Sequence, residues 1–62
     1  MTVFRVRETN WDGRVSEFDF EFQVDAEETF ENSCNDDNEK VESFNVWGTG
    51  TEEVVTEWRN KK

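Results

Sequence analysis

Apolar and polar residues alternate most regularly between residues 15 and 24, where the sequence reads VSEFDFEFQV. From Phe18 onward every second side chain is aromatic or aliphatic, and the positions between are acids or amides. A period of two is typical of a β-strand with one buried and one exposed face. The pattern predicts a strand at about 14–24 in which Phe18, Phe20, Phe22 and Val24 are buried.

Residues 2–9 alternate in the same way and predict a second strand, joined to the first by a turn at 10–14. A two-residue loop at Asp12-Gly13 would place phenylalanines opposite arginines. A three-residue loop, with Gly13 in the left-handed region, would instead place the arginines opposite Glu17 or Asp19. Because strand register follows the matching of faces, the three-residue loop is predicted.

A short helix is expected at about 26–33, directly after the phenylalanine-rich strand. Asp25 is followed three residues later by Glu28, a spacing that resembles a capping box. The helix would turn Ala26, Phe30 and Cys34 toward the sheet.

The C-terminal third predicts two more strands. Residues 40–47 fit a strand with Phe44 and Val46 inward, and 53–59 fit either a strand or a helix capped by Thr51. The β-branched run in the last segment favours the strand, which would place Val54, Thr56 and Trp58 on one face. Trp58 is assigned to the core.

The sequence therefore predicts a β-rich α+β fold for residues 1–62, as a single small domain. Its antiparallel sheet would have three to four strands, at about 2–9, 14–24, 40–47 and 53–59, with one short helix. The chain contains no Leu, Ile or Pro, so its core must be built from six Phe, three Trp and the valines. One helix is a thin cover for so aromatic a sheet face, and a homodimer is expected.

Charge is the most informative compositional feature. Sixteen acids and seven bases give a formal net charge of −9, and residues 15–39 alone carry ten acids and no base. Such a chain repels nucleic acids and anionic membranes. A basic protein surface is the expected partner.

Catalytic and metal-binding motifs are missing from the sequence. There is no His, the commonest general base and transition-metal ligand. Cys34 is a single cysteine among acids, which disfavour its thiolate. The acids and amides of 35–39 lack the ligand spacing of an EF-hand. No enzyme activity, cofactor or metal is predicted.

The favoured hypothesis is a non-catalytic acidic binding protein that docks on a basic, nucleic-acid-binding partner and inhibits or regulates it. Phage-encoded DNA mimics that block restriction, CRISPR or repair enzymes offer an analogy of charge and size. The residues expected to contact the partner are Glu17, Asp19, Glu21, Glu27, Glu28, Glu31, Asp36, Asp37, Glu39, Trp11 and Trp47.

The alternative is a small structural or oligomerisation module whose acidic surface serves solubility or salt tolerance. The sequence has no recognisable signal peptide and no apolar run long enough to span a membrane. A cytoplasmic location is expected, which for a viral protein would be the host cytoplasm.

Overall fold

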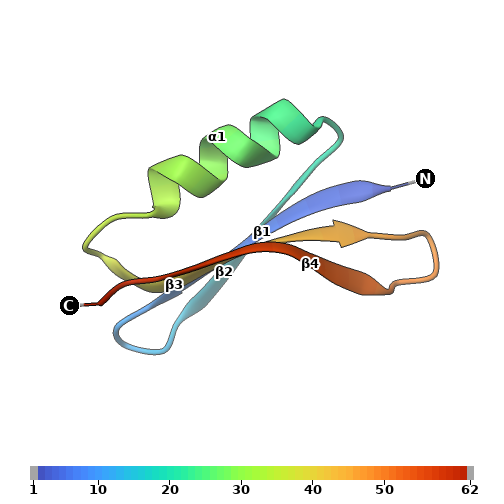
Figure 1. Cartoon of the computed structure of the whole chain (residues 1–62). Coiled ribbons are helices and arrows are strands. Elements are labelled where there is room, and N and C mark those ends of the chain that lie inside the picture. Colours follow the sequence, from blue (N-terminus) through green and yellow to red (C-terminus); the bar gives the residue numbers. More distant parts are fainter. Residues whose placement is uncertain (1, 62) are drawn as a thin grey trace.

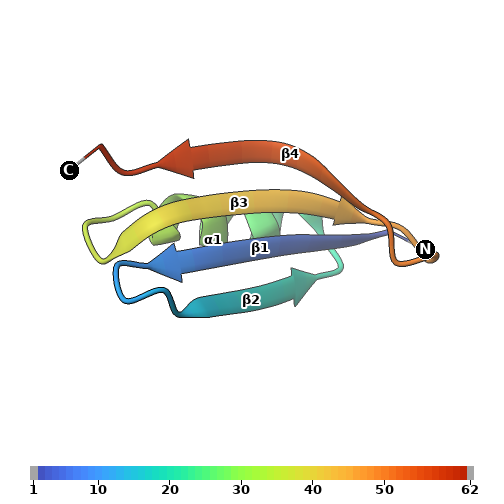
Figure 2. The same ribbon diagram turned by 90° about the horizontal axis from the view of Figure 1, so that it is seen from below.

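The computed structural model describes residues 2–61, which form a four-stranded antiparallel sheet with a helix on one of its faces (Figure 1). The elements follow the chain as β1 (Val3–Asn10), β2 (Val15–Phe20), α1 (Gln23–Ser33), β3 (Asn38–Val46) and β4 (Glu52–Arg59). The strands lie in the order β2-β1-β3-β4, so β2 and β4 are the sheet edges (Figure 2). The predicted β-rich α+β fold is confirmed, including a strand rather than a helix for the last segment.

The β1-β2 hairpin has the predicted three-residue loop, made of residues 11–13. The backbone N–H of Asn10 donates to the carbonyl oxygen of Arg14 at 3.0 Å, and that of Gly13 donates to the carbonyl oxygen of Asn10 at 3.0 Å. Gly13 has a φ of +86°, a left-handed conformation that side chains disfavour.

This loop produces the register that face matching predicts. Val6 lies opposite Phe18, and Arg7 lies opposite Glu17. The sheet face that α1 covers therefore carries Phe4, Val6, Phe18 and Phe20. Arg5, Arg7, Glu17 and Asp19 share the opposite face, which we call the open face.

The strand predicted at 14–24 is too long at its C-terminal end. β2 ends at Phe20 and α1 begins at Gln23, after Phe22 in an extended conformation. Phe22 and Val24 are therefore 64% and 67% exposed instead of buried on a strand, and Phe18 on the edge strand is 41% exposed. Only Phe20 of the three phenylalanines packs against the buried core.

The chain leaves the sheet after Phe20, and α1 then covers the core. Ala26 is buried, and Phe30 and Cys34 pack around Ala26, as predicted. The predicted capping box is wrong, since Asp25 lies inside the first turn and no side chain caps the helix. The helix begins three residues before the predicted start.

The core lies between α1 and the two central strands. Val6 of β1 and Val41 of β3 are fully buried beneath Ala26. Partly buried side chains complete this cluster at its margins, namely Phe4, Phe20, Phe30, Cys34 and Trp58. The assignment of Trp58 to the core is confirmed.

Phe44 and Val46 of β3 are buried as predicted, at 4% and 8% exposure, but on the other side of the sheet. Phe44 lies opposite Arg5 of β1, so the two share the open face. Val41, three positions before Phe44, has the opposite parity and faces the helix. The open face therefore has a small apolar layer of its own.

A register shift in the β3-β4 pairing divides the residues that were expected to share one face of β4. Ser43 lies opposite Thr56, whereas Phe44 lies opposite Val54. Val55 is the extra residue between them, and this β-bulge reverses the parity of the strand. Thr56 thus faces the helix side, while Val54 lies on the open face.

Candidate acidic docking surface

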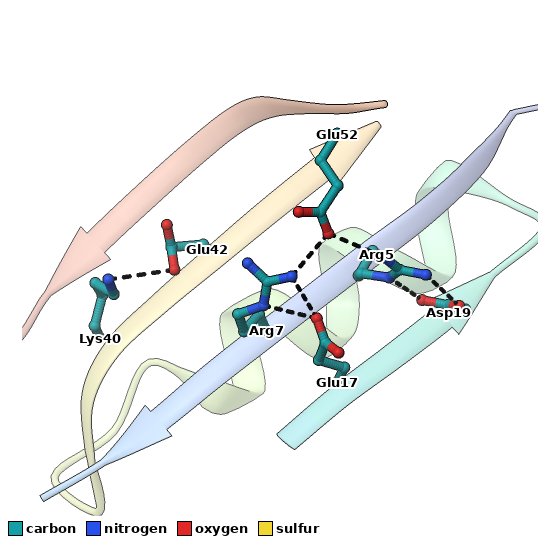
Figure 3. Close-up of polar contacts among 7 residues, drawn as sticks. All are labelled: Arg5, Arg7, Glu17, Asp19, Lys40, Glu42 and Glu52. Atoms are coloured by element: carbon teal, nitrogen blue, oxygen red, sulfur yellow. Dashed lines mark hydrogen bonds and ion pairs between the residues drawn. The ribbon is translucent and has the colours of Figure 1, made fainter. Parts of the chain in front are cut away.

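Two of the acids expected to contact a partner are bound to arginines of β1 (Figure 3). Arg5 donates from Nε to Oδ1 of Asp19 at 2.7 Å and from Nη2 to Oδ2 at 3.0 Å. Arg7 donates from Nε to Oε2 of Glu17 at 2.7 Å. Both arginines also donate to Oε2 of Glu52 on β4, at 2.9 and 2.7 Å. We call these five residues the arginine network.

The arginine network favours the charged form of two of its carboxylates, Asp19 and Glu52. Hydrogen bonds from Arg5 lower the pKa of Asp19 and that of Glu52, and the bond to Asp19 raises the pKa of Arg5. Three carboxylates share two guanidinium groups, so the network has a single net negative charge. Glu17 and Asp19 are therefore poor candidates for attracting a basic partner.

The place of Glu52 in this network was not predicted. Its position on the open face depends on the bulge in β4, and its contact with β1 depends on the order of the strands. Two more ion pairs occupy the same face, Lys40 with Glu42 at 3.4 Å and Arg59 with Glu57 at 2.7 Å. Charges on the open face are thus largely balanced.

The negative charge is concentrated in residues 21–39, which we call the acidic segment. It contains eight acids and no base, whereas the remaining 43 residues contain eight acids and seven bases. The segment consists of α1, the connections on either side of it and the start of β3. Seven of the eight acids were expected at the partner surface, and Asp25 was missed because it was assigned to the helix cap.

The acids of α1 lie outside the stripe of the helix that faces the core. Ala26 and Phe30 point toward the core, and the four acids of α1 are all exposed. These acids are Asp25, Glu27, Glu28 and Glu31. Asp25 and Glu31 are six residues apart, or ~9 Å at ~1.5 Å of rise per residue, so the four acids are spaced ~3 Å apart on average, between the ~1.7 Å of duplex DNA and the ~3.4 Å of one of its strands.

The remaining acids of the expected surface lie beside the helix. Glu21 is exposed at the bend between β2 and α1, Asp36 and Asp37 are exposed in the connection from α1 to β3, and Glu39 is exposed on β3. They extend the negative surface of α1 at both of its ends.

The two tryptophans expected as partner anchors are each 46% exposed, but they do not form one patch. Trp11 lies in the β1-β2 loop, at the end of the sheet where Asn10 pairs with Asn38. Trp47 follows the other end of β3, where its backbone N–H donates to the carbonyl oxygen of Thr51 at 3.0 Å. The length of β3 separates them.

Trp11 also has a structural role that the sequence did not indicate. Its Nε1 donates to the backbone carbonyl oxygen of Asp36 at 2.8 Å, which joins the hairpin loop to the connection after α1. Trp11 therefore adjoins the acidic segment, and part of its ring remains exposed beside it.

The thiol of Cys34 is half-buried at the end of α1. Burial raises its pKa, and the nearby carboxylate of Glu31 raises it further. A thiol held in the neutral form is a weak nucleophile. Nowhere in residues 2–61 do three acidic or cysteine side chains gather closely enough to hold a metal ion.

No protein-family model, curated protein or solved structure matches this chain. No helix in the described part of the chain has the length and apolar character needed to cross a membrane. Any function must therefore be argued from the geometry and charge of the domain itself.

Proposed function

We propose that this protein is a non-catalytic acidic binding protein that docks through α1 on the basic, nucleic-acid-binding surface of a partner and blocks it. The segregation of charge carries the proposal. The acidic segment has eight acids without a base, while the acids of the open face are bound to arginines and lysine. The negative field is therefore one-sided, and it is strongest around the helix.

A one-sided field orients the protein as it approaches a basic surface. Complementary charge increases the association rate and discriminates against acidic partners. The carboxylates of α1 are dense enough to replace a stretch of phosphates in a groove made for nucleic acid. The acids of α1 form the contact surface instead of those of β2, since Glu17 and Asp19 are already paired.

The decisive experiment removes three charges from α1 without changing its shape. Glu27→Gln, Glu28→Gln and Glu31→Gln replace exposed acids by amides of the same length and similar helix propensity. A matched control, Asp12→Asn, Glu53→Gln and Glu57→Gln, removes three exposed acids from outside the acidic segment. Both triple variants have the same net charge, so only the position of the lost charges differs.

Each protein is immobilised, and basic proteins are captured from a lysate of the source or host cell. A captured nucleic-acid-binding protein is then tested for displacement of a fluorescent duplex DNA or RNA. We expect the parent to displace it, the helix variant to associate about tenfold more slowly at low salt, and the control to resemble the parent. The difference should shrink as the Debye length falls from ~30 Å at 0.01 M salt to ~8 Å at 0.15 M.

Equal loss in both triple variants would mean that charge acts only in bulk. Full retention in both, or capture that leaves nucleic-acid binding intact, would contradict the mimic and support a module whose acids serve solubility. Circular dichroism of all three proteins must coincide for the comparison to be valid.

A further inference from the structure

A groove lies between α1 and the edge strand β4. The helix packs on β1, β2 and β3, and within the described residues no Cα atom of α1 lies within 8 Å of a Cα atom of β4. The space left open has a volume of about 150 Å³. Its apolar lining includes Ala26 of the core, Phe4 at the margin of the core, Phe30 on the helix and Val55 on β4.

The bulge in β4 is what gives the groove its outer wall. Val55 is the extra residue of the bulge, and it lines the groove although it is 53% exposed. Val54 beside it lies opposite Phe44 on the open face and is 54% exposed. Bulges commonly redirect a side chain toward a functional surface.

The groove, like α1, carries negative charges and no positive ones. Glu27 and Glu31, one turn apart on α1, both line it, and none of its lining residues is basic. Apolar side chains at the bottom and carboxylates along one wall complement a segment that carries an apolar side chain between basic ones. A second copy of this chain, with its net charge of −9, fits this groove poorly.

We propose that this groove binds one large apolar side chain of the partner, flanked by lysines or arginines. The proposal rests on the proposed function and assigns the short-range contact that follows electrostatic steering. A cavity of about 150 Å³ is large enough to hold a benzene-sized ring, so one Phe or Leu side chain would fill it. Trp11 and Trp47 are then not required as the main anchors.

The test uses two synthetic peptides, Lys-Arg-Lys-Phe-Lys-Arg-Lys and the same peptide with Ala in place of Phe. Each is titrated into the ¹⁵N-labelled protein and followed by amide chemical shifts. We expect the Phe peptide to bind about tenfold more tightly than the Ala peptide, with the largest shifts at Ala26, Phe30, Val55 and Thr56.

The chain offers a matched pair of variants. Val55→Lys places a charged chain across the groove, whereas Val54→Lys adds the same charge to the opposite face at almost equal exposure. We expect Val55→Lys to abolish the preference for Phe over Ala and Val54→Lys to preserve it.

The outcomes separate the groove from the acidic helix. Equal binding of both peptides, with chemical-shift changes confined to Asp25 and Glu28 on the outer side of α1, would rule out the groove as the binding site of the apolar side chain. The proposed function would still stand. A Phe preference that persists in Val55→Lys would also overturn it. Both proposals depend on charge complementarity. They would be contradicted if the affinity for the Phe peptide changed neither with salt nor in the double variant Glu27→Gln, Glu31→Gln.

Discussion

The guanidinium carbon of Arg7 lies 4.6 Å from the centroid of the Phe44 ring, on the face of the sheet that has no helix. A cation over an aromatic face is attracted to it, and the flat guanidinium also excludes water from the ring. Arg7 is held there by Glu17 on one side and Glu52 on the other. The arginine network therefore covers a buried aromatic ring in addition to pairing charges.

Replacing this ring should be far more costly than replacing the phenylalanine at the start of α1. Phe44 is 4% exposed and Phe22 is 64% exposed. We expect Phe44→Ala to lower the free energy of unfolding by about 3–5 kcal/mol, enough to unfold much of so small a domain. Phe22→Ala should change it by less than ~0.5 kcal/mol. Urea denaturation measures both, and a large loss in Phe22→Ala would restore the longer strand that the sequence predicts.

The ion pair between Asp19 and Arg5 should make the free energy of unfolding depend on pH in the acid range. The pKa of Asp19 is lowered by its hydrogen bonds from Arg5, so the carboxyl stabilises the fold above its unfolded pKa and ceases to do so as pH falls through its folded pKa. Free aspartate titrates near pH ~3.9, and the loss should develop below that value.

Asp19→Asn removes this titration and should flatten the acid limb of a plot of unfolding free energy against pH. The control is Asp12→Asn, because Asp12 lies in the hairpin loop and forms no ion pair among residues 2–61. It should keep the slope of the parent. An unchanged slope in Asp19→Asn would mean that the Arg5 pair does not persist in solution.

Face matching explains why so much of the hairpin could be predicted. One-residue slips would have placed Phe18 opposite Arg7, so the sequence itself selects the register and the loop. Period two could not reveal where β2 ends, because Phe22 and Val24 continue the alternation while the chain turns into α1. Nor could it reveal the bulge at Val55, which separates Val54 from Thr56.

The exposure of the acids on α1 could be predicted from local sequence, whereas the full set of contacts made by the acids of the open face could not. Acids of α1 are exposed wherever the helix lies, because Ala26 and Phe30 fix the inward side. The predicted three-residue loop already places the arginines of β1 opposite Glu17 or Asp19, but it does not reveal that Arg7 also binds Glu52 of β4, which is far away in the sequence. Long-range pairing of this kind has no local signature.

The hairpin loop depends on glycine at a single position. Gly13 has a φ of +86°, and a Cβ there would meet nothing within 4 Å, so the cost of a side chain is conformational rather than steric. We expect Gly13→Ala to destabilise the domain by about 1–2 kcal/mol. Gly13→Asn should cost less because Asn tolerates the left-handed region. Thermal melts that rank the two variants in the opposite order would contradict this account.

The homodimer stays a prediction, and its salt dependence would be informative. α1 covers most of the phenylalanine face, so the exposed apolar residues left on the sheet edges are Val15 and Phe18 on β2 and Val54 and Val55 on β4. Two chains of net charge −9 repel each other, so association should increase with added salt. Sedimentation at high protein concentration in low and high salt measures this, and a monomer in both would exclude the dimer.

Trp11 should control the order of the connection between α1 and β3. Its indole N–H bonds to the backbone of Asp36 across 25 residues of sequence, and a bond of this kind contributes about 0.5–1.5 kcal/mol. Trp11→Phe keeps an aromatic ring and removes the donor, so amides of residues 34–38 should exchange faster with solvent. Trp47→Phe is the matched control, since Trp47 has the same exposure of 46% and lies at the other end of β3. Unchanged hydrogen exchange in Trp11→Phe would mean that the ring of Trp11, and not its hydrogen bond, orders the connection, whereas equal changes in both variants would indicate a general loss of stability.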